Sequence, residues 1–410
     1  MRGRRGQWFR SVGGGLLLPF LFLGSLAPGA EGKSSCVTCH EKITAGIVRE
    51  WARSKMSGSL ECEDCHGSAH TSATDVEKAL LPTPDLCGSC HGERYGQYKE
   101  GKHSLAWIAM EALPTTGFQP HPYIEGQKGC GGCHRIGLRP SSAKEAYRYG
   151  MACTSCHTRH RFSREEAANP QACRMCHMGF DHPQWEMWSS SKHGAIYFSD
   201  PGSGRAPTCQ TCHMEDGNHR VMTAWGFLAL RLPEDDLEWM ASRTTILKGL
   251  QVLDPTGDPT PRLEVVKAGK MARLSREEWQ AERDRMLKTC TRCHSRGFAR
   301  LNLENADAMI READRLMARG IGLVAELYRD GMIVPSPGKP AFPDLLTFYE
   351  AITPIEQKLY VMFLEHRMRT FQGAFHNNPD YVTWYGLAEL KRDLVEMTRD
   401  AQEMRRGKER

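Results

Sequence analysis

The 410-residue sequence has few apolar residues for its length and no long hydrophobic run beyond its first 30 residues. Apolar side chains make up 40% of the chain, and this share already includes 16 cysteines. Without long apolar runs the chain is not an integral membrane bundle, and its unbiased composition excludes a collagen-like fibre or a low-complexity tail. A chain of this size with so few aliphatic residues needs something other than aliphatic side chains in its core.

The sequence also lacks a strong excess of charge of one sign. The formal charge is +5, and removal of the first 30 residues, which hold four arginines and no acid, lowers it to +1. A nearly neutral chain offers no strong electrostatic case for binding nucleic acid.

The first 30 residues have the pattern of an export signal. A basic stretch precedes the apolar residues 16–26, which are followed by the small residues Ala27, Gly29 and Ala30. The apolar stretch is too short to span a membrane comfortably, although an uncleaved anchor is the alternative. We therefore expect residues 1–30 to be a signal peptide and the mature chain to be periplasmic. The basic stretch contains Arg2, Arg4, Arg5 and Arg10.

No cysteine is left outside one repeated motif. All 16 cysteines fall into eight C-x-x-C-H motifs. Disulfides do not require a histidine after every second cysteine, and zinc ribbons pair C-x-x-C units without that strict histidine. The motif is instead typical of c-type haem attachment. The cysteine pairs are Cys36/Cys39, Cys62/Cys65, Cys87/Cys90, Cys130/Cys133, Cys153/Cys156, Cys173/Cys176, Cys209/Cys212 and Cys290/Cys293.

The motif has a chemical reason. Two thiols three residues apart reach the two vinyl groups of one haem, and the following histidine lies under the iron as its proximal ligand. Eight motifs predict eight covalent haems, attached outside the cytoplasm. Once the haem propionates are counted, the net charge of the mature holoprotein is about −7. The predicted proximal ligands are His40, His66, His91, His134, His157, His177, His213 and His294.

Nine further histidines are available as sixth ligands. A c-type haem used only for electron transfer usually takes a distal histidine or methionine, so the number permits either eight six-coordinate haems or one open haem. The alternative for each is an ordinary surface histidine. We predict distal ligation by His70, His103, His121, His160, His193, His219 and His376, which leaves His182 for another role and His366 as the spare.

The motif spacing predicts a mainly α-helical fold. Seven motifs crowd into residues 36–213, too few residues per haem for independent domains, so the haems themselves form the core. Residues 214–289 form an insertion with strand-like or loop pieces around 244–253 and a turn at 254–257. Beyond the last motif, helical periodicity predicts three long helices, at 301–328, at 345–371 with a weak break at Pro354, and at 382–405. We therefore expect a signal peptide at 1–30, an octahaem domain at 31–294 and a helical domain at 295–410.

Three features give the chain a resemblance to the octahaem hydroxylamine oxidoreductase family. They are the layout of seven crowded motifs and one distant motif, the segment from His177 to Trp185 with its Asp-His-Pro sequence, and the C-terminal segment from Phe375 to Tyr381. The layout alone is shared with octahaem reductases, and the two segments sharpen the match.

The resemblance implies a catalytic fourth haem, attached at Cys130 and Cys133 above His134. In the family this haem has an open distal side and is joined covalently to a tyrosine from an adjacent subunit of a homotrimer. That tyrosine corresponds to Tyr381, with Tyr385 and Tyr360 as alternatives. Ordinary helix packing of Tyr381 is the other interpretation.

The resemblance also implies the chemistry. The family's acid–histidine pair beside the open iron corresponds to Asp181 and His182, with His182 as proton acceptor and Asp181 as its orienting partner. A sixth-ligand role for His182 is the alternative. Hydroxylamine would lose three electrons to give nitric oxide or four to give nitrite, and the other haems would pass them to a small periplasmic cytochrome.

Three other functions fit parts of the sequence. A reductase of nitrite or hydroxylamine would lack the crosslinking tyrosine, and octahaem nitrite reductases usually end one motif in lysine, whereas all eight motifs here end in histidine. Hydrazine dehydrogenation is not separated from hydroxylamine oxidation by any residue. A pure electron carrier would hold eight six-coordinate haems.

Overall fold

The computed structural model describes most of the chain that follows the predicted signal. Residues 1–30, Cys130, His121 and Asp181 lie outside the described residues. All structural statements below concern residues 34–106, 131–137, 153–179, 182–221, 232–270, 275–347 and 351–408.

Short helices carry the motifs in the N-terminal part of the chain. In α3 (Cys62–His66), Glu61 and Asp64 cap the helix start reciprocally, and Gly67, with φ of 70°, ends it. Because residues three apart share a face of one helical turn, this places both cysteines of the motif on one side, with the histidine next to them. The other helices of this part are α1 (Ser35–Ile43), α2 (Ala45–Ala52), α4 (Pro84–Cys90), α5 (Gly92–Glu100), α9 (Gly131–His134), α11 (Arg164–Ala168), α12 (Gln171–Arg174), α13 (Gln184–Ser189), α14 (Lys192–Ser199) and α15 (Cys209–His213).

Single 3₁₀ turns join several of these helices. They are η1 (Lys55–Gly58), η2 (Val76–Lys78), η3 (His103–Leu105), η4 (Cys153–Ser155) and η5 (Glu215–Gly217). No β-strand occurs in the described ranges; two residues, Leu253 and Pro259, form an isolated bridge. The fold is therefore mainly α, as predicted.

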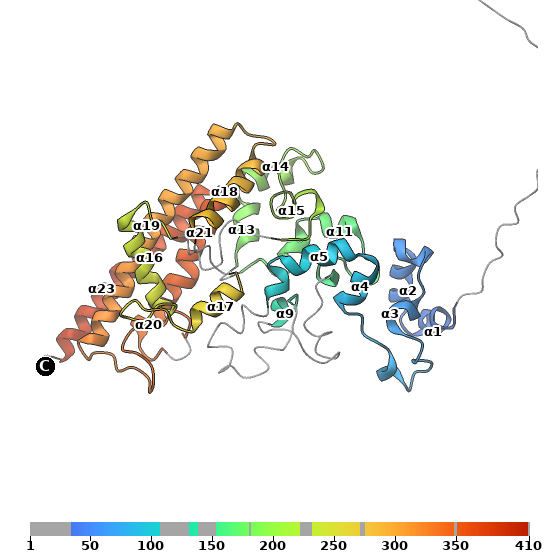
Figure 1. Ribbon diagram of the computed structural model, residues 1–410, viewed down its shortest axis with the longest axis horizontal. Helices are drawn as coiled ribbons and strands as arrows, with labels where there is room; N and C mark the ends of the chain where they lie inside the picture. Colours follow the sequence, from blue (N-terminus) through green and yellow to red (C-terminus); the bar gives the residue numbers. More distant parts are fainter. Residues whose placement is uncertain are drawn as a thin grey trace, which may run out of the picture.

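Long helices pack together at the C-terminal end of the chain, opposite α1–α3 in Figure 1. The 34-residue helix α19 packs against α16, α21 and α23. The elements here are α16 (Leu237–Gly249), α17 (Arg262–Ala268), α18 (Arg276–Cys290), α19 (Arg296–Arg329), α20 (Pro354–Val361), η7 (Met362–Arg367), α21 (Met368–Phe375), α22 (Pro379–Tyr381), η8 (Val382–Leu387) and α23 (Ala388–Lys408).

Two details of the predicted elements are wrong. Residues 244–249 are neither strand nor loop, because α16 runs to Gly249 with Asp236 capping its first turn, and only residues 250–253 lie outside the helix. Pro354 does not break a helix but begins one: Thr353 and Glu356 form a capping box, and proline at the first helical position loses no hydrogen bond. The turn at 254–257 is confirmed by the bond from Gly257 N to Asp254 O, 3.0 Å.

The apolar core lies in the C-terminal part. Its larger cluster joins α16, α19, α20, η7 and α23 through side chains such as Leu250, Met317 and Phe363, all fully buried. Helix α16 belongs to this core although the predicted domain limits group it with the haem motifs. Before residue 180, the buried apolar side chains of the described residues are Val37, Val48 and Tyr98. No helix of the described residues is long and apolar enough to cross a membrane.

Candidate haem sites

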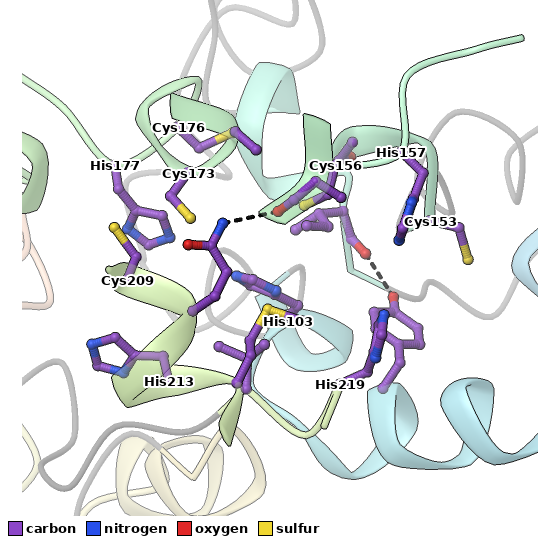
Figure 2. Close-up of a pocket in the computed structure, with 18 of the residues that line it drawn as sticks. His103, Cys153, Cys156, His157, Cys173, Cys176, His177, Cys209, His213 and His219 are labelled. Atoms are coloured by element: carbon purple, nitrogen blue, oxygen red, sulfur yellow. Dashed lines mark hydrogen bonds between the residues drawn. The ribbon is translucent and has the colours of Figure 1, made fainter. Parts of the chain in front are cut away.

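Cysteines and histidines of all eight motifs line one connected cavity. Its volume is about 2750 Å³, whereas a pocket for one small ligand is about 300–1,000 Å³. Figure 2 shows part of it, where His157 lies above His219 and His177 lies near Cys209. A cavity of this size, lined by paired thiols and imidazoles, fits several large cofactors.

Cys39 of the first motif departs from the predicted arrangement. The structure places its side chain on the exposed side of α1, and it does not line the cavity, whereas Cys36 and His40 of the same motif do. Successive residues of an α-helix are turned by about 100°, so position 40 lies roughly 40° to one side of position 36 and position 39 lies about 60° to the other side. The cavity lies on the side of α1 shared by Cys36 and His40, which turns Cys39 toward solvent. The second thioether of this haem is therefore predicted by the motif alone.

Five motif histidines each face one of the predicted distal histidines. Metal–imidazole bonds are about 2.0–2.1 Å, and a five-membered ring with bonds of about 1.33 Å places each nitrogen roughly 1.1 Å from the ring centre. Two imidazoles on opposite sides of one iron therefore have ring centres roughly 6.3 Å apart. The observed distances between ring centres are 6.1 Å for His40–His70, 6.1 Å for His66–His160, 6.2 Å for His177–His103, 6.3 Å for His157–His219 and 6.1 Å for His294–His193.

In several histidines, a hydrogen bond to a backbone carbonyl determines which ring nitrogen can bind a metal. A carbonyl oxygen only accepts, so the Nδ1 atom facing it carries the proton and Nε2 keeps the lone pair that binds a metal. The Nδ1 atoms of four histidines donate in this way, at 2.7–2.9 Å: His66 to Leu80, His134 to Ala106, His219 to Gly217 and His376 to Gln372.

Burial keeps the candidate ligands neutral. Loss of solvation, assisted by nearby histidines, lowers the pKa of His103 to about 4, of His177 to about 3 and of His376 to about 4. Neutral imidazole is the form that binds a metal. Burial lowers the pKa in the same direction for His157, His160, His193 and His219.

Two predicted distal ligands are placed less directly. His376, at the end of α21, lies close enough to His213 for their charges to interact. His121 lies outside the described residues, and the exposed His91 faces no histidine ring among those described. Both assignments stay predictions.

The fourth motif has a histidine on its distal side. The ring centre of His182 lies 6.3 Å from that of His134, with the ring planes at 77°. This is the spacing of the other pairs, so the two rings could hold one iron between them. His182 is also 6.4 Å from His177.

Tyr381 is tied to the element that follows His182, but its side chain does not line the cavity within the described chain. Asn378 donates to Met187 O and Ser190 Oγ, both at 2.8 Å, and accepts from Tyr381 N at 3.1 Å. The half-buried Tyr381 ring packs against Tyr385, with centres 5.0 Å apart. Burial raises the pKa of Tyr381.

Tyr360, the remaining alternative for the crosslink, does line the cavity. The three tyrosines therefore differ in position: Tyr360 faces the cofactor space, Tyr381 is half-buried beside it, and Tyr385 is exposed.

Contacts between cysteines of different motifs give the order of the motifs in space. Each such pair lies close enough for its thiols to interact. The motifs follow one another as first, second, third, fifth, sixth, seventh and eighth, and the fourth adjoins the sixth. The pairs are Cys36–Cys62, Cys65–Cys87, Cys87–Cys153, Cys156–Cys173, Cys173–Cys209, Cys212–Cys290 and, for the branch, Cys133–Cys176.

Sequence reasoning missed the partners that hold the ligand rings. Most are backbone carbonyls, which carry no sequence signal. The spare His366 is now placed: it lies buried among the C-terminal helices, where its Nδ1 contacts Asp393 Oδ2 at 2.5 Å.

Comparisons with known proteins agree with this arrangement. The sequence profile of the family described as "Seven times multi-haem cytochrome CxxCH" matches residues 58–243 and 263–339. These ranges hold seven of the motifs, and the motif at Cys36 precedes them.

A curated relative and two solved structures are also similar. A probable nitrite reductase–hydroxylamine oxidoreductase fusion protein of Kuenenia stuttgartiensis is 27% identical over 475 residues, which covers 91% of this chain and 52% of the relative. The chain thus spans about half the length of that relative.

The structure is similar to a reducing HAO-like protein complex of Kuenenia stuttgartiensis, with a TM-score of 0.70, 25% identity, and coverage of 90% of this chain and 85% of the other. A hypothetical multihaem protein shares the fold, with a TM-score of 0.66, 22% identity, and coverage of 92% and 96%.

Proposed function

Because the chain belongs to the family of multihaem cytochromes with C-x-x-C-H motifs, and is related to HAO-like proteins, we propose that it is an exported octahaem oxidoreductase that oxidises hydroxylamine at its fourth haem. The observation that supports this most directly is the position of the fourth motif. Its Cys133 adjoins Cys176 of the sixth motif beside the line of the other seven. A haem beside the line can react with substrate, while the haems within the line transfer electrons.

The chain's own residues would hold the cofactors. Each motif would supply two thioether links and a proximal histidine, and the paired histidines would supply the sixth ligands of six-coordinate haems. At the fourth position the iron supplies Lewis-acid and one-electron redox chemistry. The bond from His134 Nδ1 to Ala106 O, 2.9 Å, fixes the ring that faces this iron.

His182 is the residue best placed to accept protons from the substrate. Because the two ring centres are 6.3 Å apart, the His182 ring would have to move away from His134 for hydroxylamine to bind between them. From a position beside the substrate it would take up a proton, with Asp181 orienting it in the proposed pair.

The proton-acceptor role is tested by Asp181→Asn and His182→Ala in the holoprotein. Both variants should slow hydroxylamine turnover while intact-mass measurement still finds eight haems. His366→Gln is the matched control, because His366 contacts Asp393 but lies buried among the C-terminal helices, away from the motifs. Normal turnover in both site variants would exclude the role.

Peptide mass mapping of the purified protein separates oxidation from reduction. A Tyr381 peptide joined to the haem peptide that contains Cys130–His134 would support the oxidase proposal, including a trimer in which a neighbouring subunit supplies the tyrosine. The same measurement covers Tyr360, which lines the cavity. Free tyrosines at both positions would favour the reductase.

Reduction of nitrite or hydroxylamine is the second candidate. It is favoured by the similarity to a complex named as reducing, and by the position of Tyr381, whose side chain does not line the cavity in the described chain. Hydrazine oxidation is tested by the same turnover assay with hydrazine as substrate.

A pure electron carrier is favoured by one distance, the 6.3 Å between His134 and His182, which matches a six-coordinate haem. That function predicts no change in the visible spectrum when hydroxylamine is added. A spectral change confined to one haem would exclude it.

A further inference from the structure

His70 differs from the other candidate ligands in what holds its ring. Its Nδ1 contacts the carboxylate of Asp75, at 2.9 Å to Oδ1. The Nδ1 atoms of other candidate ligands meet neutral groups: backbone carbonyls at His66, His134, His219 and His376, the hydroxyl of Thr44 at His40, and the amide oxygen of Gln184 at His177. A haem held between His40 and His70 would therefore have a full negative charge next to its distal ligand.

The surrounding chain fixes the Asp75 carboxylate in place as an anion. Asp75 is buried, and its oxygens accept hydrogen bonds from Ser72 N at 2.9 Å, Thr71 N at 3.2 Å and Thr71 Oγ1 at 3.2 Å. Donors directed at a carboxylate stabilise its charged form. The nearby cation is Lys78, whose Nζ lies 3.7 Å from Oδ2 and which is 56% exposed, so solvent screens much of its charge.

A carboxylate that accepts the Nδ1 proton makes the imidazole a stronger base and a stronger iron ligand. A stronger donor stabilises ferric iron over ferrous iron, because ferric iron carries the larger positive charge. We propose that Asp75 is a positioning residue that lowers the reduction potential of the haem held by His40 and His70. This rests on the proposed ligation of that haem by the two histidines.

The position of this haem gives the effect a use. The first motif stands at one end of the line, next to the second through Cys36 and Cys62, and α1–α3 lie at the end of the molecule away from the C-terminal helices (Figure 1). An electron on a terminal haem of low potential passes inward to the next haem rather than staying. Electrons released by the proposed oxidation would therefore leave the line at another haem, and the N-terminal end would take electrons from a reduced partner protein only if the chain worked in the reductive direction.

The test is a spectroelectrochemical titration of Asp75→Asn in the holoprotein. The reduction potential of one haem should rise by about 59 mV, which for one electron is a tenfold change in the reduction equilibrium. Lys78→Gln removes a positive charge that partly offsets the charge of Asp75, so it should lower the reduction potential of the same haem. Glu77→Gln is the matched control, since it removes an exposed acid of the same turn, and should change no potential by a comparable amount.

Failure of this inference is distinguishable from failure of the ligation itself. Electron paramagnetic resonance of His70→Ala should show one fewer low-spin haem, and an unchanged low-spin signal would overturn the ligation. If that signal is lost but Asp75→Asn and Lys78→Gln both leave every potential unchanged, the ligation stands and the role of Asp75 is refuted.

Discussion

At the scale of single residues, the role of a histidine depends on where the chain places it and on what its Nδ1 atom meets. His66 donates to a carbonyl and faces His160, whereas His366 contacts Asp393 inside the helical core. The proximal ligands are predictable because the motif is local in sequence. The pairing of proximal and distal ligands is not predictable, because His66 and His160 meet only through the tertiary fold. Likewise, no neighbouring residue in the sequence shows that His366 is not a haem ligand.

The distal position can be tested by exchanging its ligand. His219→Met should raise the potential of one haem, because a thioether ligand favours ferrous iron more than imidazole does. His219 faces His157 at 6.3 Å, so the haem content should stay at eight while one midpoint shifts upward in a redox titration. The same titration on His366→Gln should leave all potentials in place, and an unshifted His219→Met protein would contradict the pairing.

At the scale of elements, a buried acid joins three helices of the C-terminal core. Asp314 of α19 is fully buried and contacts Arg243 of α16 at 2.5 Å, Arg367 of η7 at 2.7 Å and the indole nitrogen of Trp239 at 2.7 Å. The amphipathic pattern of α19 is evident from sequence, but a carboxylate at an inward position is visible only once its two guanidinium partners are in place.

Removing this acid should be costly. Asp314→Leu leaves two buried guanidinium groups without their shared anion, and should lower the free energy of unfolding by about 3–5 kcal/mol. Urea titration followed by circular dichroism measures the change. Asp330→Ala, at the exposed end of the same helix near Arg405, should change it by less than about 1 kcal/mol, and equal effects would rule out the burial argument.

The π-helical segment η8 and helix α21 contact one another through a close approach that requires glycine. A Cβ atom on Gly386 would lie 2.9 Å from the backbone nitrogen of Thr370. The helical pattern around 382–405 was predicted, but this glycine's role depends on a neighbour from another helix, so sequence periodicity did not reveal it.

The close approach predicts opposite effects at two glycines. Gly386→Ala should destabilise the protein by about 1–3 kcal/mol, because the backbone must shift. Gly322→Ala, within α19 and with nothing within 4 Å of the added carbon, should stabilise it by about 0.5–1 kcal/mol. Thermal unfolding of both variants provides the comparison, and a stabilised Gly386→Ala protein would disprove the contact.

At the scale of the whole molecule, the chain has two kinds of core. The C-terminal part is held by aliphatic side chains, whereas the N-terminal part surrounds a cavity of about 2750 Å³ lined by motif residues. The scarcity of aliphatic residues predicted that something other than aliphatic side chains fills the core, but not which part of the chain this concerns. The boundary was harder to predict, because α16 precedes the last motif in sequence yet packs on α19.

Preventing haem attachment should therefore unfold only part of the chain. Protein made without the haem-attachment machinery should lose structure around the motifs while the C-terminal helices keep their packing. Limited proteolysis should then leave a protected fragment that contains α19 and α23, identified by mass. Uniform digestion of the whole chain would show that the aliphatic core does not fold without haem. The holoprotein, which should resist digestion, is the control.

The place of the fourth motif bears on how electrons would leave it. Its Cys133 adjoins Cys176 of the sixth motif, and the fifth and seventh motifs adjoin the sixth on either side. In the proposed oxidation, which would release three or four electrons at one haem, the sixth haem would offer two onward routes. Electrons would then spread along the line in both directions from its interior rather than travel from one end to the other.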